Sequence, residues 1–275
     1  KTCNRPIASG YSCEGTYQEN GSYTERSCQG DVCVEKKFGE DGKMDSKRTC
    51  VMKGTVCYSQ GETTYDEAGN KTSHRTNCLS YGSDGSCTSY RSGTDYTYDA
   101  DGNKTSERYC GKYGADGSCT GYYRSGTDYT YDANGNKTSM RYCDSYGSDG
   151  SCTSYRSGTE YTYDANGKMT SSRPCNNYGA DGSCTSYSNN TVSRDYTYDA
   201  NGKLTSERNC WKYGADGSCT SYISGTDYTY DANGNYTSTR FCSSVGSDGS
   251  CTSYSSGTEY TYDANGNRTS ERSCS

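Results

Sequence analysis

Residues 146–175 read YGSDGSCTSYRSGTEYTYDANGKMTSSRPC, two glycine-based turns separated by Tyr- and Thr-rich stretches. The Cys-Thr-x-Tyr segment recurs at spacings of 32, 33, 32, 35 and 32 residues, starting at Cys87, Cys119, Cys152, Cys184, Cys219 and Cys251. Three shorter and more divergent copies precede these, at 13–28, 33–50 and 57–78. Such self-similarity at a fixed period is the signature of a tandem repeat protein.

The turns and their flanks predict β-hairpins, because Tyr and Thr favour strands and Asn-Gly or Asp-Gly favours a tight turn. With Asn134 and Gly135 as a two-residue type I′ loop, each acid faces an arginine on the returning strand. The same register applies to eight copies: Glu35/Arg48, Glu62/Arg75, Asp95/Arg108, Asp128/Arg141, Glu160/Arg173, Asp195/Arg208, Asp227/Arg240 and Glu259/Arg272. Cross-strand pairs of opposite charge stabilise a hairpin by roughly 0.2–1 kcal/mol each. This regularity supports the predicted register.

Alternation along these strands places the tyrosines of the Tyr-Thr-Tyr segments on one face. They form a predicted ladder of Tyr96, Tyr98, Tyr129, Tyr131, Tyr161, Tyr163, Tyr196, Tyr198, Tyr228, Tyr230, Tyr260 and Tyr262. Only 29% of the chain is apolar, and Ile, Leu and Val together number ten, whereas there are 32 Tyr and 19 Cys. An aliphatic core is therefore excluded, and stacked tyrosines are the predicted core. The aromatic and cysteine content argues against disorder.

The cysteines come in close pairs, which predicts local disulfides; bonds between neighbouring copies are the alternative. The candidate pairs are Cys3/Cys13, Cys28/Cys33, Cys50/Cys57, Cys78/Cys87, Cys110/Cys119, Cys143/Cys152, Cys175/Cys184, Cys210/Cys219 and Cys242/Cys251. This usage predicts an oxidising compartment and an extracellular or cell-surface location. The chain starts at Lys1 without a signal-peptide stretch, so we expect a processed mature form.

The sequence therefore predicts an all-β fold, an elongated, disulfide-stabilised array of β-hairpins or a β-solenoid with about 32 residues per regular repeat. We expect shorter, divergent repeats over 1–77 and regular repeats over 78–275, with the last unit incomplete. No apolar run reaches the roughly 18 residues of a membrane span.

The segment Tyr-Thr-Tyr-Asp-Ala-Asn-Gly-Asn-Lys-Thr-Ser at 129–139 resembles the YD repeats of bacterial RHS and teneurin-type proteins. Its Tyr-Asp-x-x-Gly core recurs seven times, and the resemblance covers about half of each regular copy. The cysteine-bracketed half departs from that pattern, and no RHS core motif or C-terminal toxin follows. The resemblance implies hairpins joined into a long coiled sheet; it does not imply enclosure of a cargo.

Catalytic and metal-binding patterns are weak throughout. The aspartate-rich turn from Asp99 resembles the start of a calcium loop, but its twelfth position is Cys110 rather than a bidentate Glu. The cysteine spacing is not that of a zinc site, and His74 is the one histidine. Trp211 replaces a small residue of other copies and is interpreted as a tolerated substitution. We expect no enzyme activity, no metal and no cofactor.

Two further features concern modification and assembly. Seven Asn-x-Ser/Thr sequons are candidate N-glycosylation sites, although an Asn-Gly-Asn-Lys-Thr turn creates the same pattern by itself. They begin at Asn20, Asn70, Asn103, Asn136, Asn189, Asn235 and Asn267. Cys274 stands where a tenth pair would begin, and we predict a bond from it to a second molecule in a head-to-tail homopolymer. A free thiol or a cut chain is the alternative.

The net charge of −6, with 28 basic and 34 acidic residues interleaved, favours neither nucleic acid nor a membrane surface. The predicted function is therefore structural, as a secreted subunit of an extracellular fibre or cell-surface filament. An adhesin or carbohydrate-binding module that uses exposed tyrosines to bind glycans is the alternative. Ice binding through rows of Thr is a third hypothesis, and the charged residues on the same face count against it.

Overall fold

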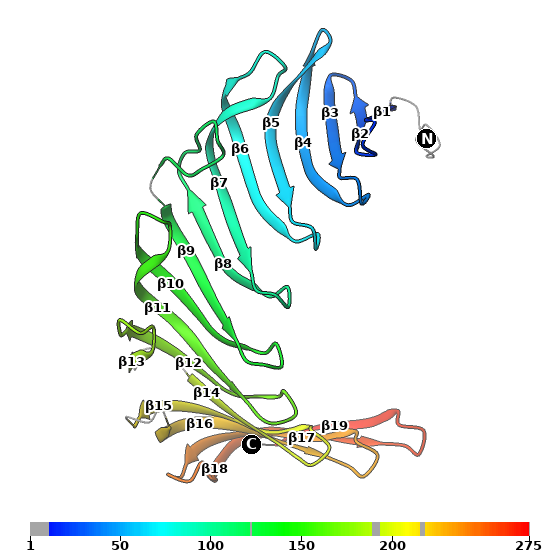
Figure 1. Ribbon diagram of the computed structural model, residues 1–275. Coiled ribbons are helices and arrows are strands. Elements are labelled where there is room, and N and C mark those ends of the chain that lie inside the picture. Colours follow the sequence, from blue (N-terminus) through cyan, green and yellow to red (C-terminus); the bar gives the residue numbers. More distant parts are fainter. Residues whose placement is uncertain (1–10, 122, 189–192, 215–217, 275) are drawn as a thin grey trace. The chain divides into compact units, whose positions relative to one another are not determined.

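The computed structural model describes residues 11–121, 123–188, 193–214 and 218–274, which form a 19-stranded antiparallel sheet (Figure 1). Within these residues there is no helix, and β1 pairs only with β2 and β19 only with β18, so that the sheet is not closed. The predicted all-β hairpin array is confirmed.

The strands follow the hairpin pattern of the sequence. They are β1 (Tyr11–Tyr17), β2 (Tyr23–Gln29), β3 (Val32–Phe38), β4 (Met44–Lys53), β5 (Val56–Tyr65), β6 (Lys71–Tyr81), β7 (Cys87–Tyr98), β8 (Lys104–Cys110), β9 (Tyr123–Tyr131), β10 (Lys137–Tyr146), β11 (Cys152–Tyr163), β12 (Met169–Tyr178), β13 (Cys184–Tyr187), β14 (Ser193–Tyr198), β15 (Leu204–Tyr213), β16 (Cys219–Tyr230), β17 (Tyr236–Val245), β18 (Cys251–Tyr262) and β19 (Arg268–Cys274).

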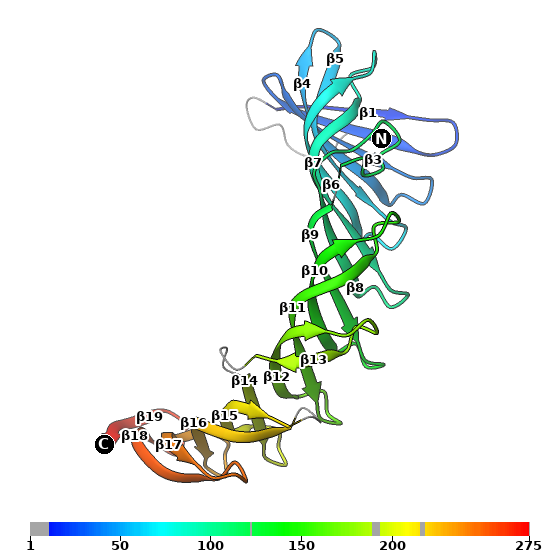
Figure 2. The same cartoon turned by 90° about the vertical axis from the view of Figure 1, so that its left-hand side faces the viewer.

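The chain divides into two compact units, one of Lys1–Tyr129 and Tyr142–Cys152, the other of Thr130–Arg141 and Thr153–Ser275. In each unit, consecutive strands pair with one another. In the second unit, the strands β15, β16, β17 and β18 lie side by side in this order (Figure 2). There β12 pairs with both β13 and β14, which together replace the single long strand of other copies.

The main turn differs from the predicted type I′ loop. Asp164 donates its N–H to the carbonyl of Lys168 (2.9 Å), and Gly167 donates to the carbonyl of Asp164 (3.0 Å). Gly167 has φ +76°, whereas Asn166 is not among the residues with positive φ. The loop therefore has three residues, a type I turn followed by a left-handed glycine. It needs only one residue in the costly left-handed region, and the Asp164 carboxylate accepts the N–H groups of Asn166 and Lys168.

A β-bulge next to this turn restores the predicted register. Tyr163 faces Met169 and Thr162 faces Ser171, so that Thr170 is the extra residue of the returning strand. The hydroxyl of Thr162 is hydrogen-bonded to those of both Thr170 and Ser171, at 2.8 and 2.7 Å. Because the longer loop and the bulge offset each other, seven predicted acid–arginine pairs do face each other: Glu35/Arg48, Glu62/Arg75, Asp95/Arg108, Glu160/Arg173, Asp195/Arg208, Asp227/Arg240 and Glu259/Arg272.

The most buried side chains are not those of the predicted tyrosine core. The twelve ladder tyrosines are only half-buried. The fully buried side chains are chiefly cysteines and serines of the opposite face, joined by Tyr90 and Tyr113. The prediction that the ladder is the core is therefore wrong. The cysteine-bracketed loops contact this opposite face, for example where Arg75 and Arg141 donate hydrogen bonds to the carbonyls of Gly117 and Gly182.

Candidate functional site

The cysteine-bracketed loops, which we call arms, are each closed by a local disulfide. The bonds join Cys28–Cys33, Cys50–Cys57, Cys78–Cys87, Cys110–Cys119, Cys143–Cys152, Cys175–Cys184, Cys210–Cys219 and Cys242–Cys251. Cys3 and the side chain of Cys13 lie outside the described residues, and Cys274 is a free, exposed thiol. Eight disulfides indicate an oxidising environment.

Four arms in the described part of the chain accept a hydrogen bond from an arginine of an earlier hairpin. The guanidinium of Arg75 donates a 2.8 Å hydrogen bond to the carbonyl of Gly117 and lies 4.8 Å from the ring centre of Tyr113. Arg141 makes the corresponding bond to Gly182, at 2.9 Å, and Arg208 to Gly249, at 2.7 Å. These contacts span 41 or 42 residues, so that each arginine reaches the second arm after its own hairpin.

Gly93 leaves room for the ring of Tyr113, a residue of the arm between Cys110 and Cys119. A Cβ added to Gly93 would lie 2.9 Å from the ring of Tyr113 and 2.5 Å from the carbonyl oxygen of His74. Only glycine fits such a close approach of ring and backbone. The sequence does carry this signal, since Ser-Gly-Thr precedes the acid in five copies, beginning at Ser92, Ser125, Ser157, Ser224 and Ser256. Sequence reasoning missed it.

The acids tie consecutive hairpins together. Asp195 lies 4.0 Å from the guanidinium of Arg173 in the preceding hairpin and accepts a 2.9 Å hydrogen bond from Tyr222 of the following one. Arg208 likewise pairs with Asp227 and Arg240 with Glu259, each across to the next hairpin. At these acids the ion pair is therefore with the arginine of the preceding hairpin and not with the directly facing one, whereas Glu35 binds Arg48 as predicted. Diagonal neighbours on adjacent strands remain within reach of long side chains.

These ties shift the pKa values of the groups that make them. Burial, then the hydrogen bond to Asp195 and its charge, raises the pKa of Tyr222 to about 12. Tyr187 responds in the same way to burial and to Glu160, which accepts its 2.8 Å hydrogen bond, and its pKa also rises to about 12. Both hydroxyls therefore remain protonated donors at every physiological pH.

The tyrosine face carries a second set of ties. The hydroxyl of Tyr98 donates to the carbonyl of Lys71 (3.0 Å), and the Lys71 ammonium lies 4.3 Å from the ring centre of Tyr96. Three other hydroxyls donate to the start of the preceding returning strand: Tyr163 to Lys137, Tyr198 to Met169 and Tyr262 to Tyr236, at 2.8–2.9 Å. The half-buried rings thus link neighbouring hairpins.

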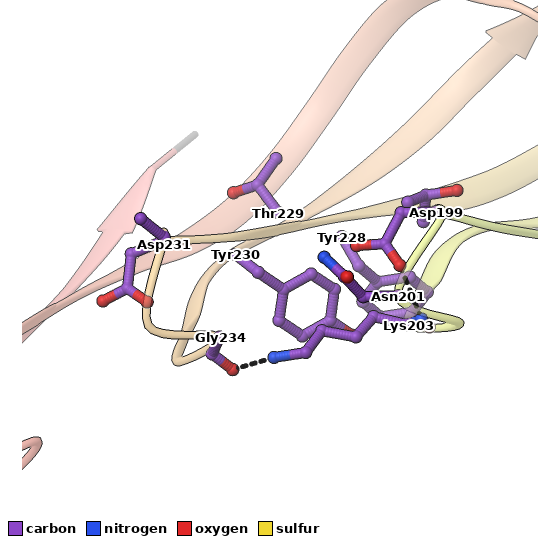
Figure 3. Close-up of a pocket in the computed structure, with 10 residues that line it drawn as sticks. Asp199, Asn201, Lys203, Tyr228, Thr229, Tyr230, Asp231 and Gly234 are labelled. Carbon is purple, nitrogen blue, oxygen red and sulfur yellow. Dashed lines mark hydrogen bonds between the residues drawn. The ribbon is translucent and has the colours of Figure 1, made fainter.

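An open groove of about 310 Å³ interrupts this face between the turns after β14 and β16 (Figure 3). The ring of Tyr230 lies in it, but within the described residues its hydroxyl makes no hydrogen bond, unlike the four equivalents above. Tyr236 packs against the rings of Tyr228 and Tyr230, at 6.0 and 5.6 Å. Instead, Lys203 extends across and donates to the carbonyl of Gly234.

The sequon asparagines mostly serve the turns. Five donate their side-chain amide to the turn aspartate at 3.0–3.1 Å, namely Asn70, Asn103, Asn136, Asn235 and Asn267. Asn20 is exposed and accepts from Ser22, whereas Asn189 lies outside the described residues.

Three other residues singled out in the sequence have ordinary surroundings. His74 is hydrogen-bonded to Thr63 (2.9 Å), and Trp211 is 53% exposed. Glu35 lies near Cys50 and Cys57, but these two sulfurs are joined in a disulfide and are not available as thiolate ligands.

No helix in the described part of the chain has the length and apolar composition needed to cross a bilayer. No family model matches the sequence, and no curated protein does. Among solved structures, TcdB2-TccC3 without its hypervariable C-terminal region is 14% identical, with a TM-score of 0.30; the match covers 95% of this chain and 15% of that one. A porin-like protein from Bacteroides uniformis is 10% identical, with a TM-score of 0.27, over 96% and 92% of the two chains. TM-scores of this size do not establish a shared fold.

Proposed function

We propose that this chain is a secreted structural repeat protein, a subunit of an extracellular fibre or cell-surface filament. The observation that carries the proposal is the tie at Asp195, which joins three consecutive hairpins through Arg173 and Tyr222. Contacts of this kind repeat along the chain, so stability grows as units are added. Each regular unit also contributes a covalent bond, and such bonds preserve a fold outside the cell.

Head-to-tail assembly is the finer part of the proposal. Every residue of β19 is exposed, and within the described residues Arg272 has no acid partner, although its equivalents Arg208 and Arg240 bind the acid of the next hairpin. The outer edge of β19 therefore presents the groups that another repeat of the same kind would satisfy. In the proposed assembly a second copy supplies that repeat, and Cys274, an exposed free thiol, forms the covalent link.

Electron microscopy of the 275-residue chain, purified without reductant, tests the assembly. We expect uniform threads that shorten when Arg272→Ala removes the unpaired guanidinium. Gel electrophoresis without reductant, compared with reduced samples, tests the covalent version, for which Cys274→Ser is the control. Dispersed single particles that do not associate at any concentration would contradict the filament proposal, and monomer alone in both lanes would contradict the bond through Cys274.

A further inference from the structure

We propose that the groove between the turns of β14–β15 and β16–β17 binds one hexose unit of a neutral glycan. This role goes beyond the structural function and does not depend on it, because a single molecule contains the whole groove. The groove lies at the lower end of the size range of small-ligand sites, which suits a single sugar ring.

The polar groups of the groove have unused hydrogen-bonding capacity. The hydroxyl of Tyr230 has no partner within the described residues, and the exposed Asn201 side chain has none either. Asp199 uses one carboxylate oxygen to accept from the N–H of Lys203, at 2.8 Å. In the next hairpin, the second oxygen of the equivalent Asp231 accepts from the side-chain amide of Asn235. The residue equivalent to Asn235 in the turn of Asp199 is Lys203, which has no side-chain amide, so the second oxygen of Asp199 stays open. A carboxylate oxygen, an amide and a phenol together match the hydroxyls of a sugar.

The aromatic rings supply the other half of sugar recognition. Tyr228 and Tyr230 both line the groove and are half-buried, and Tyr236 packs against both rings. The side chain of Lys203 extends across the groove to the carbonyl of Gly234, and its ammonium lies 4.8 Å from the ring centre of Tyr230 (Figure 3). Amphipathic rings held rigidly can contact the C–H groups of a sugar while its hydroxyls reach the polar groups.

The charges of the groove select a neutral ligand. Asp199 and Asp231 carry two negative charges against the single positive charge of Lys203, which is already hydrogen-bonded to a carbonyl. A sialic or uronic acid would therefore meet net repulsion. Glucose, galactose, mannose and N-acetylglucosamine carry no charge and remain as candidates.

The experiment is a titration of the disulfide-intact chain with these four sugars and their short oligomers, followed by saturation-transfer NMR and calorimetry. We expect saturable binding of at least one of them, with a Kd on the order of 1 mM. Tyr230→Phe removes the free hydroxyl and should weaken binding about fivefold. Asn201→Ala, at an exposed turn position, should have a similar effect without disturbing the fold.

The neighbouring repeat offers matched controls. Tyr198→Phe removes a hydroxyl that donates to Met169, and Asn166→Ala changes the corresponding turn residue, so both should leave sugar binding within twofold of the parent. An unchanged near-UV circular dichroism spectrum shows that each variant is folded. The proposal is overturned if no neutral sugar binds saturably, if an acidic sugar binds more tightly, or if the variants and their controls lose affinity equally.

Discussion

The hydroxyl of Tyr222 donates a 2.9 Å hydrogen bond to Asp195, a residue of the preceding hairpin. The equivalent pair, Tyr254 and Asp227, makes the same hydrogen bond at a more solvent-exposed position, where Tyr254 is 48% exposed. One interaction thus occurs at two levels of burial. This allows its contribution to be measured against a matched position.

Removing the buried hydroxyl should cost more than removing the exposed one. Tyr222→Phe leaves Asp195 with one donor fewer in a covered site, and we expect a loss of about 1–2 kcal/mol in the free energy of unfolding. Tyr254→Phe should cost less than half as much, because water can replace the lost donor. Urea unfolding monitored by tyrosine fluorescence measures both, and equal losses would show that burial does not decide the strength of the tie.

Replacing the glycine under an arm should displace that arm. In Gly93→Ala the new methyl group would collide with the ring of Tyr113 and with the backbone of His74, and we expect a destabilisation of about 1–3 kcal/mol. Gly39→Ala is the control, because the nearest atoms there are side-chain oxygens of Asp41 and Asp45 at 3.1–3.2 Å. Near-UV circular dichroism should change only for Gly93→Ala. An unaltered spectrum and stability would mean that Tyr113 is not packed as described.

Acid should weaken the site of Glu35. Burial alone would raise the pKa of this carboxyl, but the hydrogen bonds and charges of Arg48 and Arg26 outweigh it and hold the pKa below its ordinary value. The stabilisation is therefore fully present above the unfolded pKa, about 4.3, and is lost as the pH falls through the folded pKa. Hydrogen exchange of β3 and β4 at a series of pH values measures the loss, and Glu35→Gln should remove the pH dependence.

Asp95 should respond to acid in the opposite sense. Burial raises the pKa of Asp95, and this outweighs the nearby Tyr113 hydroxyl, the charge of Arg75 and the 3.5 Å hydrogen bond from Tyr123, all of which lower it. The folded state therefore favours the protonated acid, and the penalty for burying the charge is relieved as the pH falls through the raised pKa. Asp95→Asn should stabilise β7 and β8 at neutral pH, as measured by their hydrogen-exchange rates. A destabilised variant would show that its hydrogen bonds outweigh burial.

Reduction should open the arms before the hairpins. Each regular disulfide spans nine residues, and closing a loop of that size contributes about 2–3 kcal/mol in the chain-entropy estimate. After reduction, we expect fast hydrogen exchange at 176–183, while β11 and the part of β12 that pairs with it, 169–175, stay protected by their backbone pairing. Cys175→Ser with Cys184→Ser should reproduce this at one arm. A single cooperative loss of all protection would contradict separate arms.

Sequence patterns determined the strands and their register, but not the side-chain partners. Charge alternation placed Glu160 opposite Arg173, as the structure has it, yet Arg173 pairs with Asp195 on the adjacent strand. Directly opposite and diagonal acids are both within reach of an arginine, so strand pairing alone does not choose between them. The type I′ turn was predicted wrongly for a related reason. The extra residue of the three-residue loop is offset by the bulge at Thr170, so both turn types give the same strand register.

The covered face could not be found from local periodicity. The 32 tyrosines supply more apolar surface than any other residue type in the chain, which favoured the tyrosine ladder as the core. Which face of the sheet is buried, however, depends on where the arms fold. That in turn depends on contacts such as Arg75 with Gly117, which lie 42 residues apart. Local sequence patterns do not reveal the groove at Tyr230 either. There Tyr236 packs against the rings of Tyr228 and Tyr230, whereas the tyrosines equivalent to Tyr230 donate their hydroxyls to the preceding returning strand.

The reach of Arg75 to Gly117 sets a minimum length for an autonomous fragment. A piece cut to one hairpin and its own loop would lack the guanidinium that anchors the loop, since this comes from two units upstream. Excised single modules should therefore remain unstructured, whereas pieces of three or more should fold. Gain or loss of modules during evolution would then be tolerated in the middle of the array more easily than a reduction to one or two.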